Sequence, residues 1–170
     1  MNPNMLGQPN MLGQANMLSL MKPRLSKTPS SSMGAYSVPA VTWHDYVHVL
    51  LMESGHVARA AIHRVKNGRH LASTEDLTLN QEQVEALLQA FSDSTALRKD
   101  GIFLQHDEYT LTRITDGRIM VGRDARSGSG CVIFKCNTCL IVACYEDGNL
   151  PGGCYAIVTR MGDFLVENGF

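Results

Sequence analysis

From residue 130 to the C-terminus, the pattern of hydrophobic and polar positions predicts a β-hairpin followed by an amphipathic helix. Two β-rich apolar runs, 131–135 and 140–145, flank Asn137-Thr138, which is short enough to be a hairpin turn. The Pro-Gly-Gly sequence at 151–153 ends the strand pattern, and proline suits the first turn of a helix. Apolar residues then recur at steps of three and four before Gly169, namely Ile157, Val158, Met161, Phe164 and Leu165. Because such a stripe must be buried, we expect this helix to pack on the sheet that contains the hairpin.

The residues that follow Thr42 predict a first helix and a first hairpin. Thr42 can cap a helix that ends at Gly55 and carries apolar side chains at Trp43, Tyr46, Val47, Leu50 and Leu51. The alanine-rich run 59–65 is then typical of a strand, and Asn67-Gly68 is a strong signal for a hairpin turn. Residues 69–72 would return beside the first strand.

The middle of the sequence predicts a second helix and three short strands. Asn80 and Gln83 resemble a capping box, which would open a helix with Val84, Leu87, Leu88 and Phe91 on one face. Apolar runs at 102–104, 109–114 and 118–122 follow, separated by turn residues. This order predicts an α+β domain with an antiparallel sheet of about six or seven strands. We expect the N- and C-terminal helices on one face of the sheet and the shorter helix on the other.

The first 41 residues differ in composition from the rest of the sequence. They hold five of the six prolines, a serine run at 30–32, and the sequence Pro-Asn-Met-Leu-Gly-Gln twice, at 3–8 and 9–14. Because this composition favours disorder, we expect a disordered N-terminal extension at 1–41 and a single domain at 42–170. Alternatively, the Met-Leu pairs are short contacts for a partner or fold back on the domain.

Charge is divided unevenly between these two parts. The extension carries Lys22, Arg24 and Lys27 without an acidic residue, which leaves 12 basic and 16 acidic side chains, a net charge of −4, for the rest. An acidic domain is a poor candidate for nucleic-acid binding. No apolar run is long enough to span a membrane, and the start lacks the apolar block of a signal peptide. We therefore expect a cytoplasmic protein with reduced cysteines, whose basic extension could modulate partner binding.

The cysteines raise the question of zinc or redox chemistry. Cys136 and Cys139 form a CxxC motif, which is a weak signal on its own. If a two-residue turn joins them, Cys136 faces Cys139 and Cys131 faces Cys144 across the hairpin. Cys131 and Cys136 are five residues apart and point to opposite faces, so the four sulfurs cannot form a tetrahedral zinc site. A cross-strand disulfide between Cys131 and Cys144 is the remaining thiol hypothesis.

Other residue types give no catalytic or metal-binding pattern. His44 and His48 have a spacing that can chelate a metal, but no cluster of Cys, Asp or Glu accompanies them. The sequence contains no nucleophile elbow, zinc-protease, P-loop or Rossmann fingerprint. We therefore expect a protein that is not an enzyme and needs no metal or cofactor.

Aromatic residues, in contrast, gather at the two ends of the domain. Trp43 and Tyr46 lie on the first predicted helix, and Phe164 and Phe170 lie on or after the last one. Two terminal helices packed side by side on one sheet face would leave an aromatic trough between them. Such a trough suits polyproline, whose helix is already extended and loses little entropy on binding.

Residues 42–170 resemble the profilin family in several motifs that occur in the family's order. The start, Trp43-His-Asp-Tyr-Val, resembles the family's W-x-x-Y-V, and Ala60-Ala-Ile resembles its first strand. Gly101-Ile-Phe-Leu resembles its central motif, G-[LI]-x-L. The end, with Pro151-Gly and Met161-Gly-Asp-Phe-Leu-Val-Glu-Asn-Gly, is similar to P-G…L-G-D-Y-L-[IV]-x-x-G. The motifs are specific when taken together, and the extension has no counterpart in ordinary profilins.

The resemblance implies a regulator of actin assembly that binds actin monomers and proline-rich proteins. The implied polyproline site comprises Trp43, Tyr46, His70, Phe164, Leu165 and Phe170. His70 stands where a second tryptophan is usual, which predicts weaker but not abolished binding. The implied actin site comprises Thr110, Leu111, Arg113, Arg123, Lys135 and Gly152, while Glu108 replaces a common lysine and reverses one charge.

The resemblance also implies phosphoinositide binding, for which Arg123, Arg126 and Lys135 are the candidate residues.

Two alternatives to a profilin-like function come from other classes of protein. One is a small α/β/α sensor or scaffold module that binds a ligand without actin activity, and the other is a thiol-based redox or metal protein centred on the Cys136/Cys139 hairpin.

Overall fold

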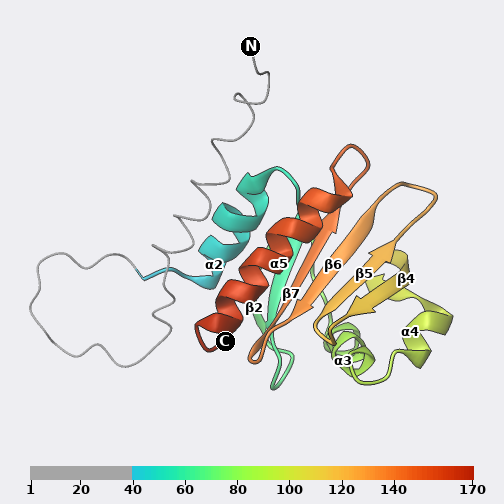
Figure 1. Ribbon diagram of the computed structural model, residues 1–170, viewed down its shortest axis with the longest axis horizontal. Coiled ribbons are helices and arrows are strands. Elements are labelled where there is room, and N and C mark those ends of the chain that lie inside the picture. Colours follow the sequence, from blue (N-terminus) through green and yellow to red (C-terminus); the bar gives the residue numbers. More distant parts are fainter. Residues whose placement is uncertain (1–39) are drawn as a thin grey trace, which may run out of the picture. The chain divides into compact units, whose positions relative to one another are not determined.

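The computed structural model describes residues 40–170, and almost all of the predicted extension at 1–41 lies outside them. Seven strands form one antiparallel sheet in the order β2-β1-β7-β6-β5-β4-β3 (Figure 1). The strands are β1 (Arg59–Arg64), β2 (His70–Ser73), β3 (Ile102–Leu104), β4 (Asp107–Thr115), β5 (Ile119–Arg123), β6 (Gly130–Lys135) and β7 (Cys139–Tyr145). All the predicted strands are present, and their ends lie within two residues of the predicted ends.

The first predicted helix is present, but its turns are of three kinds. It begins as α2 (Trp43–Asp45), continues as the π-helical segment η2 (Tyr46–Leu51) and ends in the 3₁₀ turn η3 (Met52–Ser54). The Met52 N–H donates to the Val47 carbonyl, five residues earlier, which is the π-helical spacing. Gly55 ends the helix in the left-handed conformation with φ 76°, as a terminating glycine is expected to do.

The other helices are α3 (Gln81–Ala90), α4 (Thr95–Asp100) and α5 (Pro151–Glu167). The predicted capping box of α3 is confirmed: the Gln83 N–H donates to Asn80 Oδ1 at 2.8 Å, and the Asn80 N–H donates to Gln83 Oε1 at 3.2 Å. Helix α4 was not expected from the sequence. It is a short helix whose N-cap is Ser94, and the carboxylate of the preceding Asp93 accepts a hydrogen bond from the Thr95 N–H at 3.0 Å.

The helices cover opposite faces of the sheet, as predicted. Helix α5 packs on β6 and β7, and the first helix packs on β1 and β2 (Figure 1). Helices α3 and α4 contribute Leu87 and Leu97 to a core on the other face. Alternate residues of β6 therefore serve the two cores: Ile133 belongs to the α3 side, whereas Phe134 contacts α5 at Gly162. None of the helices within residues 40–170 is both long and apolar enough to cross a membrane.

Candidate functional site

The first candidate surface is an aromatic cluster where the first helix meets the C-terminus. The Trp43 ring lies 5.6 Å from the Tyr46 ring and 5.6 Å from the Phe170 ring, and the latter pair is edge-to-face. We call Trp43, Tyr46 and Phe170 the aromatic cluster. Trp43 and Phe170 are half-buried, whereas Tyr46 is fully buried. Burial raises the pKa of Tyr46 to about 12.

Hydrogen bonds at the end of α5 fix the position of Phe170. Its N–H donates to the Leu165 carbonyl at 2.9 Å, and its carbonyl accepts a bond of 3.0 Å from the N–H of Asn137 in the β6–β7 turn. Gly169, with φ 90°, allows the backbone to turn back after the helix. The last residue is therefore tied to both the helix and the sheet, and its ring is held against Trp43.

Two further residues of the predicted polyproline site lie on α5 with different exposures. Leu165 is fully buried, so it supports the surface from below, whereas Phe164 is half-buried. Of the six predicted residues, Trp43, Phe164 and Phe170 are thus the half-buried aromatic side chains, and Tyr46 and Leu165 form part of the core beneath.

The ring contact of His70 goes to His63 and not to the aromatic cluster. The two imidazoles are 5.5 Å apart and edge-to-face, and His70 Nε2 lies 2.8 Å from Ser73 Oγ. His63 is opposite Leu140 in the ladder, and Leu140 belongs to the core on the α3 side. Burial lowers the pKa of His63, although its hydrogen bond with the Gly68 carbonyl opposes this. The register between β1 and β2 shifts at this point, which leaves the half-buried Leu71 as the extra residue.

The second candidate surface is a hollow of about 350 Å³ between strands β4–β7 and the start of α5. It brings together three residues of the predicted actin site: Arg113, Arg123 and Gly152. The rest of its lining consists of Thr112, Val121, Val132, Tyr145, Pro151 and Tyr155. We call this surface the arginine hollow. Thr110, also predicted, is exposed and pairs with Arg123 across the β4–β5 ladder.

Both arginines of the hollow are available to an acidic ligand. Arg113 and Arg123 are exposed, and neither forms an ion pair within residues 40–170. The Arg113 guanidinium carbon lies 5.0 Å from the centre of the Tyr155 ring, a cation–π geometry. Tyr145 is buried, which raises its pKa even though the positive charge of Arg123 acts in the opposite direction. Tyr155 is not among the site residues predicted from the sequence; it follows Gly152 by three residues in α5, which places both on one face of the helix.

The sheet separates the remaining predicted actin residues from this hollow. Leu111 belongs to the core on the α3 side and is 8% exposed. Lys135 pairs with Leu140 of that same core, and its Nζ lies 6.0 Å from the centre of the Phe91 ring, next to α3. The set proposed from the resemblance for phosphoinositides is divided in the same way. Arg123 faces the hollow, Arg126 is exposed in the β5–β6 loop, and Lys135 lies on the opposite face.

The cysteine thiols lie in the interior of the domain. All five cysteines are free and buried. The predicted register is confirmed, since Cys131 pairs with Cys144, while the Cys136 N–H donates to the Cys139 carbonyl at 2.8 Å. Burial raises the pKa of Cys144 to about 11. In the part of the sequence that the structure describes, no group of three or more His, Cys, Asp or Glu residues could hold a metal, although the His44 and His48 rings stack 4.1 Å apart.

Comparison with known proteins identifies one family. A family model described as Profilin matches residues 41–170. The profilin of Schizosaccharomyces pombe is 28% identical over 130 residues, which is 76% of this chain and 100% of the relative. The structure of Acanthamoeba castellanii profilin IB is similar with a TM-score of 0.71 and 28% identity, over 76% of this chain and 100% of that one.

Two more distant structures share the fold and were solved with partners. Mouse profilin IIa, in complex with a double repeat from the FH1 domain of mDia1, has a TM-score of 0.66 and 18% identity over 76% of this chain and 100% of that one. LokiProfilin2, in complex with rabbit actin, has a TM-score of 0.58 and 14% identity over 71% of this chain and 92% of that one.

Proposed function

Because this chain belongs to the profilin family, we propose that it binds monomeric actin and proline-rich ligands and so regulates actin filament assembly. Profilins are non-enzymatic, and the structures solved with rabbit actin and with an FH1 repeat are of profilins. We propose the arginine hollow as the actin-binding surface and the aromatic cluster, with Phe164, as the proline-rich ligand site. The cytoplasm, typical of the family, is the proposed location.

The observation that carries this proposal is the way in which α5 connects the two surfaces. Pro151 and Gly152, at its start, line the arginine hollow, and Phe170 follows its end in the aromatic cluster. A helix of 17 residues is about 25 Å long at the α-helical rise per residue. Ligands at its two ends can therefore be bound at the same time, which is what a protein that links actin monomers to proline-rich partners requires.

The chemistry of each surface fits its proposed ligand. Half-buried Trp43 and Phe170, held in an edge-to-face pair, offer a rigid apolar surface for a polyproline helix. Arg113 and Arg123, free of ion pairs within the described residues, offer anchors for acidic groups in a broad protein interface. Binding at the hollow would regulate assembly sterically, because a covered monomer can still add at one filament end while spontaneous nucleation is suppressed.

Anionic phosphoinositide headgroups are a further proposed ligand, and Arg123 and Arg126 support that part of the proposal. Lys135 does not, since its side chain lies over Phe91 on the other side of the sheet. Sedimentation with vesicles that contain phosphoinositides tests this proposal: binding should fall when Arg123 is changed to Glu and should not respond to Lys135→Glu.

Two measurements test the main proposal. Trp43 is the only tryptophan, so its fluorescence reports directly on decaproline at the aromatic cluster. A saturable change is expected, and no change at millimolar peptide would count against the site. Pyrene-actin polymerisation, with and without a proline-rich nucleator segment, tests both surfaces together. The protein should slow spontaneous nucleation, and elongation should continue when the nucleator is present.

A further inference from the structure

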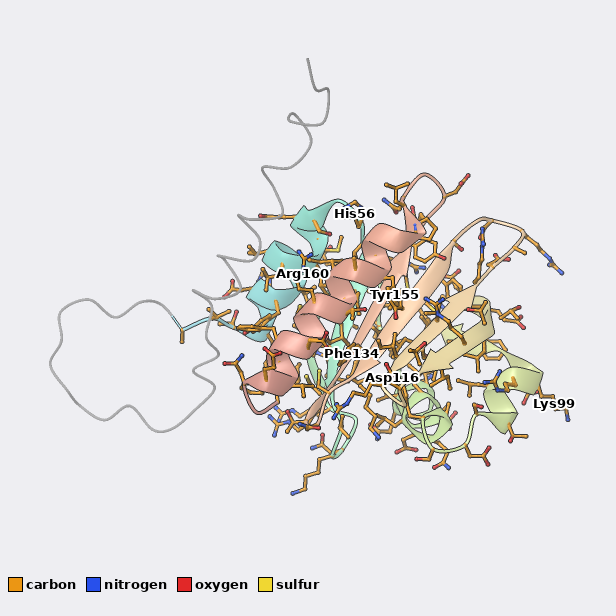
Figure 2. The ribbon with its side chains drawn as sticks, in the orientation of Figure 1. His56, Lys99, Asp116, Phe134, Tyr155 and Arg160 are labelled. Carbon is orange, nitrogen blue, oxygen red and sulfur yellow. The ribbon has the colours of Figure 1, made fainter. Side chains whose placement is uncertain are left out.

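We propose that Tyr155 is a positioning residue of the actin-binding surface, which holds the Arg113 guanidinium over the arginine hollow. This inference rests on the proposed actin binding. Tyr155 is not among the actin-site residues implied by the family resemblance. Tyr155 lies in the first turns of α5, on the side of the helix that faces β5 and β6 (Figure 2).

The contact between the two residues joins two elements that are far apart in the sequence. Arg113 comes from β4, and its guanidinium carbon lies 5.0 Å from the centre of the Tyr155 ring on α5. Both side chains line the hollow, as does Arg123. The ring therefore lies where it can restrain an arginine that would otherwise extend freely from an exposed strand position.

Arg113 needs such a restraint for two physical reasons. It is exposed and has no ion pair within the described residues, so no other interaction of that kind opposes its large rotamer entropy. Its neighbour in the hollow, Arg123, carries the same charge, and the lining of the hollow includes no Asp or Glu to balance them. The negative face of an aromatic ring attracts a guanidinium without neutralising it. Tyr155 can thus hold Arg113 in place and leave its charge available to an acidic partner.

This role depends on the aromatic ring of Tyr155 and not on its hydroxyl group. The Tyr155→Phe variant should therefore keep the positioning role. The Tyr155→Leu variant should lose it, because leucine is apolar but has no π face. A cation–π contact at an exposed site corresponds to about a two- to fivefold change in affinity. Tyr155→Leu should weaken actin-monomer binding by that factor, and Tyr155→Phe should bind like the wild type.

A double-mutant cycle separates positioning from direct contact with actin. In an Arg113→Met background, Tyr155→Leu should cause no further loss of affinity, because the residue that it positions is absent. An equal loss in both backgrounds, or no loss in either, would overturn the inference. Decaproline binding, measured by Trp43 fluorescence at the other end of α5, should stay unchanged in every variant and shows that each one is folded.

A second measurement does not depend on actin. NMR of the arginine Nε–H groups should show an ordered Arg113 in the wild type and in Tyr155→Phe, and a mobile Arg113 in Tyr155→Leu. If the wild type fails to bind actin while this difference in order is present, the proposed function is wrong and the positioning contact stands. If Arg113 is equally mobile in all three proteins, the positioning role is wrong whatever the affinity for actin.

Discussion

The ring of Phe134 in β6 lies directly against the backbone of Gly162 in α5. A methyl group at position 162 would be 2.4 Å from two atoms of that ring, closer than carbon atoms can approach. Phe134 is 1% exposed, and Figure 2 shows it next to α5. The absence of a side chain at Gly162 thus sets how closely α5 can approach the sheet, and with it the position of Tyr155 and of the backbone that leads to Phe170.

The first prediction is that Gly162→Ala destabilises the fold. The added methyl group must push α5 away from Phe134, and overpacking of this kind costs about 1–3 kcal/mol, more than the gain in helix propensity. Urea unfolding should show the loss as a lower midpoint. Glu167→Ala, at an exposed position of the same helix, is the control and should have little effect. Adding Phe134→Leu to Gly162→Ala should recover part of the stability, and a double variant that is additive would argue against the clash.

The second prediction concerns Trp43. Replacing it with leucine removes the edge-to-face contact with Phe170 and the largest flat surface of the aromatic cluster. We expect decaproline affinity, measured by calorimetry because the fluorophore is lost, to fall about tenfold, as is typical of aromatic anchors in an interface. Actin-monomer affinity should be unchanged, because the arginine hollow is at the other end of α5. An equal loss at both surfaces would show that the variant is unfolded or that the two sites are not independent.

The third prediction tests whether His70 takes part in polyproline binding, as the family resemblance implies. The resemblance places His70 in the polyproline site, whereas its ring contact in the structure goes to His63. We therefore expect His70→Ala to leave decaproline affinity within about twofold of the wild type, less than the loss expected of an interface anchor. If His70→Ala lowers decaproline affinity as much as Trp43→Leu does, His70 is part of the polyproline site.

The fourth prediction uses two equal charge reversals on opposite faces of the sheet. Arg123→Glu places an acid in the arginine hollow and should weaken actin-monomer binding by at least about tenfold, more steeply at low salt. Lys135→Glu changes the net charge by the same amount, but its side chain lies over Phe91 on the α3 side, so it should have a much smaller effect. Native-gel or fluorescence titration with actin monomers measures both, and equal losses would show that overall charge, not the hollow, determines binding.

The fifth prediction is a loss of stability at high pH. Burial raises the pKa of Tyr46 to about 12, that of Cys144 to about 11 and that of Cys154 to about 12. In the unfolded protein these groups have their ordinary pKa values, near 9 for the thiols and 10 for tyrosine. Above those pH values the folded state therefore binds more protons than the unfolded state does. The stability contributed by each thiol is therefore complete below about pH 9 and that contributed by Tyr46 below about pH 10, and each contribution decreases by about 1.4 kcal/mol per pH unit up to the folded pKa. Urea midpoints should be flat from pH 7 to 9 and fall from pH 9 to 11, and a flat profile to pH 11 would contradict the burial of these groups.

Local chemistry explains why most secondary structure could be predicted. The Asn80/Gln83 capping box and the left-handed Gly55 depend on residues close in sequence, and both occur where they were expected. The pairing of Cys131 with Cys144 followed from the length of the Asn137-Thr138 turn alone, because a two-residue connection sets the register of a hairpin. The alternation of side chains along β6 also followed from the sequence: Cys131 lies in the core on the α3 side, whereas the Cys136 sulfur contacts the Gly162 carbonyl of α5.

The composition of the two surfaces depended on the tertiary structure. The sequence alone determined the order of the elements other than α4, the α+β class, the family resemblance and the aromatic residues at both ends of the domain. It could not determine that Lys135 faces α3 while Arg113 and Arg123 meet at the start of α5, or that Arg113 packs over the Tyr155 ring. Those relationships join β4, β5 and α5, which are brought together only when the apolar stripe of α5 packs on the sheet. The burial that drives this packing is non-directional, and the close fit of Phe134 to Gly162 selects the arrangement that the protein adopts.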